Sequence, residues 1–280
     1  RLPKKLLDEE INHIQDIGAE IKTNTKVGKD FGINDLGKMG FSAILVSVGA
    51  HKTRILGIEG EDLTGVFDAL DFLARTNSSE QVKIGQRVVV IGGGNVAIDS
   101  ARTAHRLGAK EVAILYRRSK DEMPANPYEI KEAEDESIEI QFLVAPKRIL
   151  GENNHVNSIE CLKMKLGEPD QTGRRAPLPI GGSEFTIQTD SVILAIGEAP
   201  ELSAFSKEIE MGEGNTVAVE PYSAETSQSG IFAAGDCVTG PATFIEAILA
   251  GKKAAESIDQ YLQGKRTQKI EKILEGRSQT

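Results

Sequence analysis

The stretch Val88-Val-Val-Ile-Gly-Gly-Gly-Asn-Val-Ala97 decides the fold, because four aliphatic residues run into three glycines and then into a helical pattern. Gly92, Gly94 and Ala97 stand in the order G-x-G-x-x-A. In that order the first glycine permits a tight turn, the second lets a pyrophosphate approach the backbone, and the alanine lets the helix pack closely on the strand. The phosphate is then expected at the N-terminus of the helix.

The segments on either side of this stretch complete a βαβ unit. They are a strand at 88–91, a helix at 95–107 followed by Gly108, and a second strand at 111–116. A purely structural glycine turn is the alternative. The strand–helix–strand order favours a dinucleotide-binding domain.

Two adjacent arginines, Arg117 and Arg118, follow the second strand of this unit. A domain that prefers NAD places a carboxylate about 20 residues beyond the fingerprint, where it accepts a hydrogen bond from the ribose 2′-hydroxyl. Guanidinium groups at that position pair with a 2′-phosphate instead. The pair therefore favours NADP(H) over NAD(H), with an ordinary surface arginine pair as the alternative.

A second motif, Ile231-Phe-Ala-Ala-Gly-Asp236, ends a predicted strand with a glycine and an acid. A helix predicted over Phe244–Leu262 follows it. This order suits recognition of a cofactor's hydroxyl-rich linker by Asp236, beside Gly235, and of its electron-rich ring by the helix dipole. The alternative is that Asp236 only caps a turn or the start of a helix.

The rest of the chain alternates between helical and strand-like patterns. Pro3 opens a helix with an apolar face that Gly18 ends, and a strand at 21–27 is predicted from its alternation. Phe41–Val48 and Asp190–Ile196 read as strands that are apolar on both faces, and they end at Gly49 and Gly197. Further predicted elements are a connection at 50–84 with a helix near 67–75, a helix at 126–136, an antiparallel flap at 138–193, and a short helix or disorder from Gly264.

Composition excludes several classes of protein. The chain has 280 residues, and its 33 basic and 42 acidic residues give a formal net charge of −9, so neither nucleic acid nor an anionic membrane surface is an expected partner. No apolar run approaches the ~18 residues of a membrane span. Cys161 and Cys237 form no paired motif, and the four histidines show no metal spacing, so we expect no metal site. These features predict a cytoplasmic protein whose redox chemistry comes from bound cofactors.

Several segments together resemble one known family, the small (β) subunit of NADPH-dependent glutamate synthase and its relatives, which include the NADPH half of dihydropyrimidine dehydrogenase. The likeness covers nearly everything from Arg1 to Leu262 in family order. The segments that carry it are GGGNVAIDSARTAHRLG at 92–108, YRRSKDEMPA at 116–125, LGEPDQTGRR at 166–175, GSEFTIQTDSVILAIGEAP at 182–200 and GIFAAGDCVTGPATFIEAILAGKKAA at 230–255.

The resemblance implies an α/β flavoprotein with two dinucleotide-binding domains, in which a Rossmann-like NADPH domain at 76–198 is inserted into an FAD domain formed by 1–75 and 199–280. In the family the fingerprint that holds the ADP part of FAD lies upstream of the segment similar to RLPKKLLDEEI, as does a cysteine-rich iron–sulfur domain. We therefore expect an N-terminally truncated chain with an incomplete FAD domain. Whether it retains FAD stays open.

The resemblance also assigns roles to residues. The pyrophosphate of NADPH would lie on the glycine turn, the 2′-phosphate on the two arginines, and the nicotinamide near Gly197. Asp236 would bind the linker of FAD, and Thr243 with the following helix start would lie near its ring. The cofactor-binding set is Gly92, Gly93, Gly94, Asn95, Val96, Arg117, Arg118, Gly197, Gly235, Asp236 and Thr243.

The function implied is hydride transfer from NADPH to FAD, followed by electron transfer to an iron–sulfur domain or a large catalytic subunit. The cofactors carry that chemistry, so no side chain is assigned a catalytic role. The alternative is a non-catalytic NADP(H)-binding module that controls docking to another subunit. A dithiol reductase would need a paired-cysteine motif, which the sequence lacks. The terminal acceptor and the oligomeric state, including a homo-oligomer, stay open.

Overall fold

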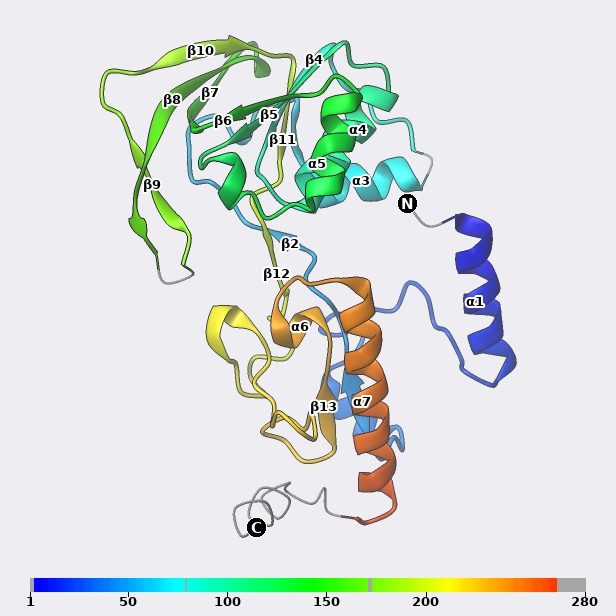
Figure 1. Cartoon of the computed structure of the whole chain (residues 1–280). Coiled ribbons are helices and arrows are strands. Elements are labelled where there is room, and N and C mark those ends of the chain that lie inside the picture. The colour runs from blue at the N-terminus through cyan, green and yellow to red at the C-terminus, as the bar shows by residue number, and fades with distance from the viewer. Residues whose placement is uncertain (1–2, 79, 171–172, 266–280) are drawn as a thin grey trace. The chain divides into compact units, whose positions relative to one another are not determined.

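The computed structural model describes residues 3–78, 80–170 and 173–265 (Figure 1). Most of the tail for which a short helix or disorder is predicted lies outside these residues. The chain divides into two compact units. Unit 1 comprises the described residues up to Ser47, Glu201–Val238 and the described residues from Thr243 onward, and unit 2 comprises Val48–Pro200 and Thr239–Ala242.

Unit 2 is built on a five-stranded sheet in which all neighbours are parallel. Its centre is rich in β-branched residues that are buried on both faces, which is the composition that a covered parallel sheet requires. In spatial order the strands are β3 (Val66–Asp68), β11 (Ser191–Leu194), β4 (Arg87–Ile91), β5 (Glu111–Tyr116) and β6 (Glu139–Phe142).

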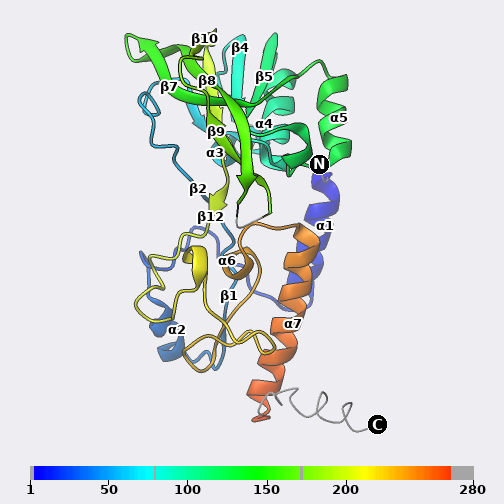
Figure 2. The ribbon, with the colours of Figure 1, turned by 60° about the vertical axis from the view of Figure 1, so that its left-hand side comes forward.

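Alternate residues of the central strands enter two different cores. Val88 and Val90 pack with three helices on one face, whereas Val89 and Ile91 pack with an antiparallel sheet on the other (Figure 2). The period of two along a strand produces this division. The helices are α3 (Ala69–Asn77), α4 (Asn95–Arg106) and α5 (Pro127–Asp135), and the short η1 (Lys120–Glu122) precedes α5.

The antiparallel sheet is the predicted flap. Its path is β10-β8-β7, and β9 pairs with the far part of the long β8. The prediction is correct apart from the two ends of its range, where β6 and the first residues of β11 join the central sheet in parallel. The strands are β7 (Val144–Glu152), β8 (His155–Pro169), β9 (Arg175–Pro179) and β10 (Phe185–Gln188), and a separate antiparallel pair joins β2 (Lys52–Thr53) to β12 (Glu198–Ala199).

The boundary between the units differs from the predicted one. Residues 48–75 were expected with the first part of the chain, yet they belong to unit 2. The physical reason is that β3 pairs with β11, and that Phe72 of α3 is completely buried in the helix-side core. Leu56, Ile58 and Leu63 pack on the other core of this unit, which starts at Val48.

The described residues of unit 1 form a two-stranded parallel sheet, which pairs β1 (Ile44–Val46) with β13 (Ile231–Ala233). The alternating segment at 21–27 does not form the predicted strand, because it is largely exposed and makes only an isolated bridge from Val27 to Phe31. β1 is shorter than predicted and its Leu45 is 37% exposed. The helices are α1 (Lys4–Asp16), α2 (Ile33–Lys38), η2 (Glu213–Asn215), α6 (Asp236–Thr239) and α7 (Phe244–Leu262).

Two helices of unit 1 leave their apolar residues exposed. None of the residues of α1 is buried, although Leu6, Leu7 and Ile14 form its predicted apolar face. Phe244 and Ile245, at the start of α7, are also exposed. Among the residues described, no helix has the length and apolar composition needed to cross a membrane.

Candidate functional site

The glycine turn after β4 is shaped by close backbone contacts. Gly92 has φ +143°, and a Cβ there would lie 2.0 Å from the carbonyl oxygen of Ala195. A Cβ on Gly93 would lie 2.4 Å from the ring of Tyr116. The first two glycines are therefore required for packing, and they place the start of α4 at the carboxyl edge of the sheet.

The start of α4 is open. Gly94 is its N-cap in an extended conformation, no side chain caps the helix, and the first turn contains no acidic residue. A Cβ on Gly94 would meet no atom within 4 Å. The first backbone N–H groups thus lack a side-chain acceptor, and the positive end of the helix dipole is not neutralised. This chemistry fits the pyrophosphate of a dinucleotide.

Asn95 and Val96, the next predicted residues, form the first turn of α4. Asn95 is exposed and Val96 is half-buried. The side-chain oxygen Oδ1 of Asn95 accepts a hydrogen bond from the backbone N–H of Asn126 at 3.0 Å. The backbone N–H of Ala125 donates to the carbonyl of Gly93 at 3.0 Å. The glycine turn is therefore bonded to the segment that follows η1.

The structure separates the two predicted arginines. Arg117 directly follows β5 at the same sheet edge, is exposed, and forms no hydrogen bond or ion pair with any described residue. The Arg118 side chain is only 7% exposed. Its Nη2 donates to Oδ2 of Asp170 at 2.5 Å, and its Nε donates to the carbonyl of Arg175 at 2.8 Å. Only Arg117 is thus left ready for an anionic ligand.

Gly197 lies three residues beyond β11, which is the other neighbour of β4. Its φ is +105°, it is half-buried, and a Cβ on it would meet nothing within 4 Å. Its carbonyl accepts a hydrogen bond from the backbone N–H of Arg54 at 3.0 Å. Since β11, β4 and β5 are adjacent and parallel, the segments that carry Gly197, the glycine turn and Arg117 leave the sheet at one edge.

In unit 1, Gly235 and Asp236 follow β13. Gly235 has φ +77°, and Asp236 is the first residue of α6 and is half-buried. Within the described part of the chain the Asp236 carboxylate accepts no hydrogen bond. The alternative interpretation of Asp236 as a cap is therefore not supported, and its oxygens are available to a ligand.

Thr243 has a structural role at the start of α7. It is the N-cap of a capping box, in which its backbone N–H and its hydroxyl donate to Oε2 of Glu246 at 2.9 and 2.6 Å. The hydrogen bond from the Thr243 hydroxyl, followed by that from the backbone, lowers the pKa of Glu246. Side chains of this helix therefore occupy its own N-terminus.

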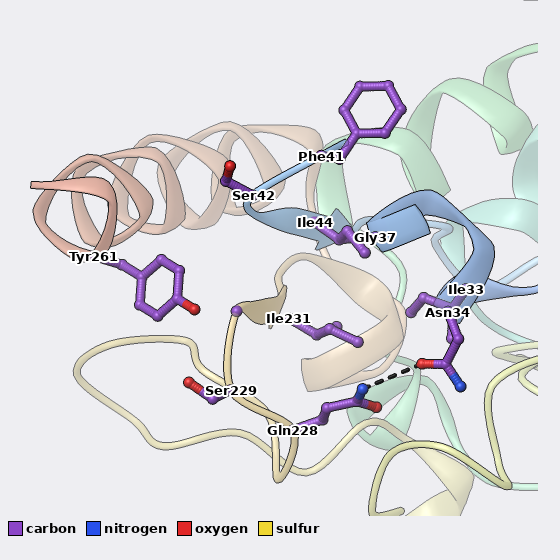
Figure 3. Close-up of a pocket in the computed structure, with 11 residues that line it drawn as sticks. Ile33, Asn34, Gly37, Phe41, Ser42, Ile44, Gln228, Ser229, Ile231 and Tyr261 are labelled. Atoms are coloured by element: carbon purple, nitrogen blue, oxygen red, sulfur yellow. Dashed lines mark hydrogen bonds between the residues drawn. The ribbon is translucent and has the colours of Figure 1, made fainter. Parts of the chain in front are cut away.

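A separate pocket in unit 1 is lined by none of these residues (Figure 3). Ile44 and Ile231, the first residues of β1 and β13, line it together with Tyr261. Nε2 of Gln228 donates to Oδ1 of Asn34 at its edge. The pocket is thus at the opposite end of the strands from Asp236.

Neither cysteine is placed for redox chemistry. Cys161 is completely buried in β8, and burial raises the pKa of its thiol to about 12. Cys237 is buried in unit 1 against the carbonyls of Val46 and Ala234. Within the described ranges, no three His, Cys, Asp or Glu residues lie close enough to hold a metal ion.

Sequence reasoning missed the partners of Arg118. Asp170 and Arg175 lie in a segment of the chain distant from the glycine turn, and Glu122 lies in η1. The only signal was that YRRSKDEMPA and LGEPDQTGRR both contributed to the family resemblance. No pattern in the sequence indicated that these two segments meet.

Comparison with known proteins gives a matching family and similar curated proteins. Residues 3–251 match the family described as pyridine nucleotide-disulphide oxidoreductase. The chain is 42% identical over 279 residues to the beta subunit of the NADP(+)-dependent formate dehydrogenase of Moorella thermoacetica, a match that covers 98% of this chain and 39% of that protein. It is 35% identical over 281 residues to the small chain of the NADPH glutamate synthase of Escherichia coli K12, with coverage of 94% and 59%. The predicted family resemblance is confirmed.

A solved structure supports the fold class. A point mutant of FprA from Mycobacterium tuberculosis superimposes with a TM-score of 0.74 at 20% identity, which covers 94% of this chain and 74% of that one. The predicted α/β fold is thereby confirmed. The chain spans about two fifths to three fifths of the length of the two curated relatives.

Proposed function

This chain belongs to the pyridine nucleotide-disulphide oxidoreductase family, and we propose that its unit 2 binds NADPH, whose hydride passes to FAD bound with residues of unit 1. The observation that carries this proposal is the open N-terminus of α4, at a sheet edge shared with the exposed Arg117. A helix start without its own acid binds phosphates.

The preference for NADPH rests on the side chain that follows β5. An acidic residue there would accept a hydrogen bond from a free 2′-hydroxyl, whereas this chain presents the unpaired guanidinium of Arg117. A guanidinium pairs with a phosphate through charge-assisted hydrogen bonds. Both curated relatives described above carry NADP(+) or NADPH in their names, which agrees with this choice.

The residues of unit 2 bind and orient the nucleotide. Gly92 and Gly93 fix the turn, the backbone N–H groups of Asn95 and Val96 would hold the pyrophosphate, and the open space at Gly197 would admit the nicotinamide. When bound, the nicotinamide supplies a hydride and the flavin divides its two electrons into single-electron steps. No side chain of the chain has to act as a general acid or base.

The residues of unit 1 contribute to flavin binding. The free carboxylate of Asp236 can accept hydrogen bonds from the ribityl hydroxyls, and Gly235 lets that linker approach the backbone. Because the Thr243 hydroxyl is engaged with Glu246, its proposed role is to fix the start of α7 beside the flavin ring.

We propose a second protein, or an iron–sulfur domain, as the electron acceptor. The names of the relatives describe them as a beta subunit and a small chain. One belongs to a formate dehydrogenase and the other to a glutamate synthase, so the acceptor is specified outside the residues that they share with this chain. The rival proposal is a non-catalytic NADP(H)-binding module that controls docking.

The deciding experiment is an absorbance spectrum of the chain mixed with FAD and then freed of unbound flavin. A retained band at about 450 nm that bleaches under anaerobic NADPH, and much less under NADH, supports hydride transfer. NADP+ binding by calorimetry without any retained flavin favours the nucleotide-binding module. Absence of NADP+ binding contradicts both.

A further inference from the structure

The loop that carries Arg117 is tied at one side to Asp170, which follows β8, and to Arg175, which begins β9. We call residues 117–122 the phosphate loop, and the four side chains of Arg118, Glu122, Asp170 and Arg175 the brace. We infer that the brace holds the phosphate loop in the shape that presents Arg117 to a 2′-phosphate, so that Arg118 and Asp170 are positioning residues for NADP(H) preference. This inference rests on the proposed function of unit 2.

The first half of the brace is the buried Arg118. Its side chain is 7% exposed, and its guanidinium donates to the Asp170 carboxylate and to the backbone carbonyl of Arg175. A buried guanidinium requires such partners, because an unpaired charge away from water is costly. Asp170 neutralises the charge of Arg118, which therefore attracts a ligand only weakly.

In the second half of the brace the phosphate loop supplies the acid and the β8–β9 hairpin supplies the arginine. Arg175 lies on the hairpin and Glu122 on the phosphate loop. Nε of Arg175 donates to Oε1 of Glu122 at 2.5 Å. The Glu122 side chain is 8% exposed and also accepts hydrogen bonds from the backbone N–H and the hydroxyl of Ser119. The pKa of Glu122 is lowered, mainly by the hydrogen bond from the Ser119 hydroxyl. Burial opposes this effect, and the hydrogen bond from Arg175 adds to it. Each segment thus supplies one acid and one arginine.

The other side of the phosphate loop is tied to the glycine turn. The Tyr116 hydroxyl donates to the backbone carbonyl of Glu122 at 2.6 Å, and its ring packs on Gly93. The backbone N–H of Ala125 donates to the carbonyl of Gly93. Since the adenosine of the dinucleotide fixes the separation between pyrophosphate and 2′-phosphate, this double attachment sets Arg117 at one distance from the start of α4.

Arg118 is buried in the brace, whereas Arg117, the residue before it, is exposed to solvent. A loop freed from the hairpin would let Arg117 sample many orientations, and binding a 2′-phosphate would then cost the entropy of ordering it. The inference therefore predicts a loss of affinity that is confined to ligands with a 2′-phosphate.

The opposing idea is that Arg118 is itself a phosphate ligand that Asp170 holds in reserve. The two ideas predict opposite signs. If Asp170 holds Arg118 in reserve, removing its charge raises the affinity for a 2′-phosphate. If Asp170 positions the loop, removing its charge lowers that affinity.

The experiment is calorimetric titration of the 280-residue chain with 2′,5′-ADP and, separately, with 5′-AMP. Three variants are compared with the wild type: Arg117→Ala, Asp170→Asn and Asp190→Asn. Asp190→Asn is the matched control, because it breaks another carboxylate–arginine pair of unit 2, to Arg87 at 2.5 Å. We expect Arg117→Ala and Asp170→Asn to weaken 2′,5′-ADP binding about tenfold or more. AMP binding should stay within about twofold, and Asp190→Asn should leave the ratio of the two affinities unchanged.

A rescue variant separates positioning from loss of folding. The exchange Arg118→Asp with Asp170→Arg restores opposite charges across the brace, and we expect it to recover part of the preference that either single change removes. An unchanged preference in Asp170→Asn, a gain of 2′,5′-ADP affinity, or an equal loss in Asp190→Asn overturns the inference. A wild-type chain that binds both ligands equally overturns the proposed NADP(H) preference itself.

Discussion

The N-termini of α4 and α7 differ in whether a side chain of the protein caps them. α4 follows β4 directly and α7 follows β13 and the short α6. The N-cap of α4 is Gly94, and this helix start has no side-chain cap and no acid. α7 begins at Thr243, which forms a capping box with Glu246. The N-terminus of a helix can bind an external anion only where no acidic or capping side chain of the protein already occupies it. This comparison supports the proposal that the α4 start binds a phosphate, whereas the α7 start is closed by its own side chains.

The largest effect is expected from giving α4 the kind of start that α7 has. Gly94→Asp places a carboxylate where the pyrophosphate should lie. The extended backbone conformation of Gly94 is one that an aspartate N-cap adopts. Affinity for NADP+ should fall roughly 100-fold or more through charge repulsion. The helix itself should gain a few tenths of a kcal/mol. Calorimetric titration and a thermal melt measure the two effects.

Gly94→Asn is the matched control, because asparagine has the shape and capping ability of aspartate without its charge. We expect it to melt like Gly94→Asp and to lose much less affinity. Wild-type affinity in Gly94→Asp would show that the phosphate does not bind at α4.

The converse change opens the start of α7. Thr243→Ala removes the hydroxyl that bonds Glu246, and we expect a loss of about 1 kcal/mol in the stability of unit 1. NADP+ affinity should stay at the wild-type value, because this helix start is not the phosphate site. Differential scanning calorimetry with and without NADP+ measures this. We expect NADP+ to raise the unfolding temperature of unit 2 and the substitution to lower that of unit 1. A shared shift would mean that the units do not unfold separately.

The smallest effect is a pH dependence at the same cap. The folded-state pKa of Glu246 is lowered from 4.5, mainly by the Thr243 hydroxyl. Its contribution to stability is therefore present above pH 4.5 and is lost as the pH falls through the lowered value. Urea midpoints of the wild type and Glu246→Gln should differ at neutral pH and converge in acid. A constant difference at all pH values would assign the cap to shape rather than charge.

The sequence predicts the α4 region well because its determinants are local. β5 has its predicted bounds, and β4 and α4 differ from theirs by a single residue, since aliphatic runs, glycines and helix periodicity act over a few residues. The same holds for α7, where the predicted range is the observed one. The Thr243–Glu246 capping box is also readable from its spacing, although we predicted only a helix there.

Determinants distant in the sequence are not predictable in this way. Arg117 and Arg118 are identical side chains, and only the encounter of Arg118 with Asp170 decides which of them stays exposed. Phe72 fixes the unit boundary through packing against strands that the chain reaches much later. The segment at 21–27 has the alternation of a strand but no neighbouring strand to pair with, so the pattern alone misleads.

The short β2–β12 pair has a consequence for the order of folding. The chain enters unit 2 through Lys52–Thr53 and leaves it through Glu198–Ala199, and these two segments pair with each other. Once unit 2 has folded, the segments that enter and leave it are therefore held together, and β1 can pair with β13 by closing a loop from which the residues of unit 2 are excluded. The entropic cost of joining the two halves of unit 1 is thus met by the folding of the segment between them. Assembly should begin in the insertion and finish in the part that surrounds it.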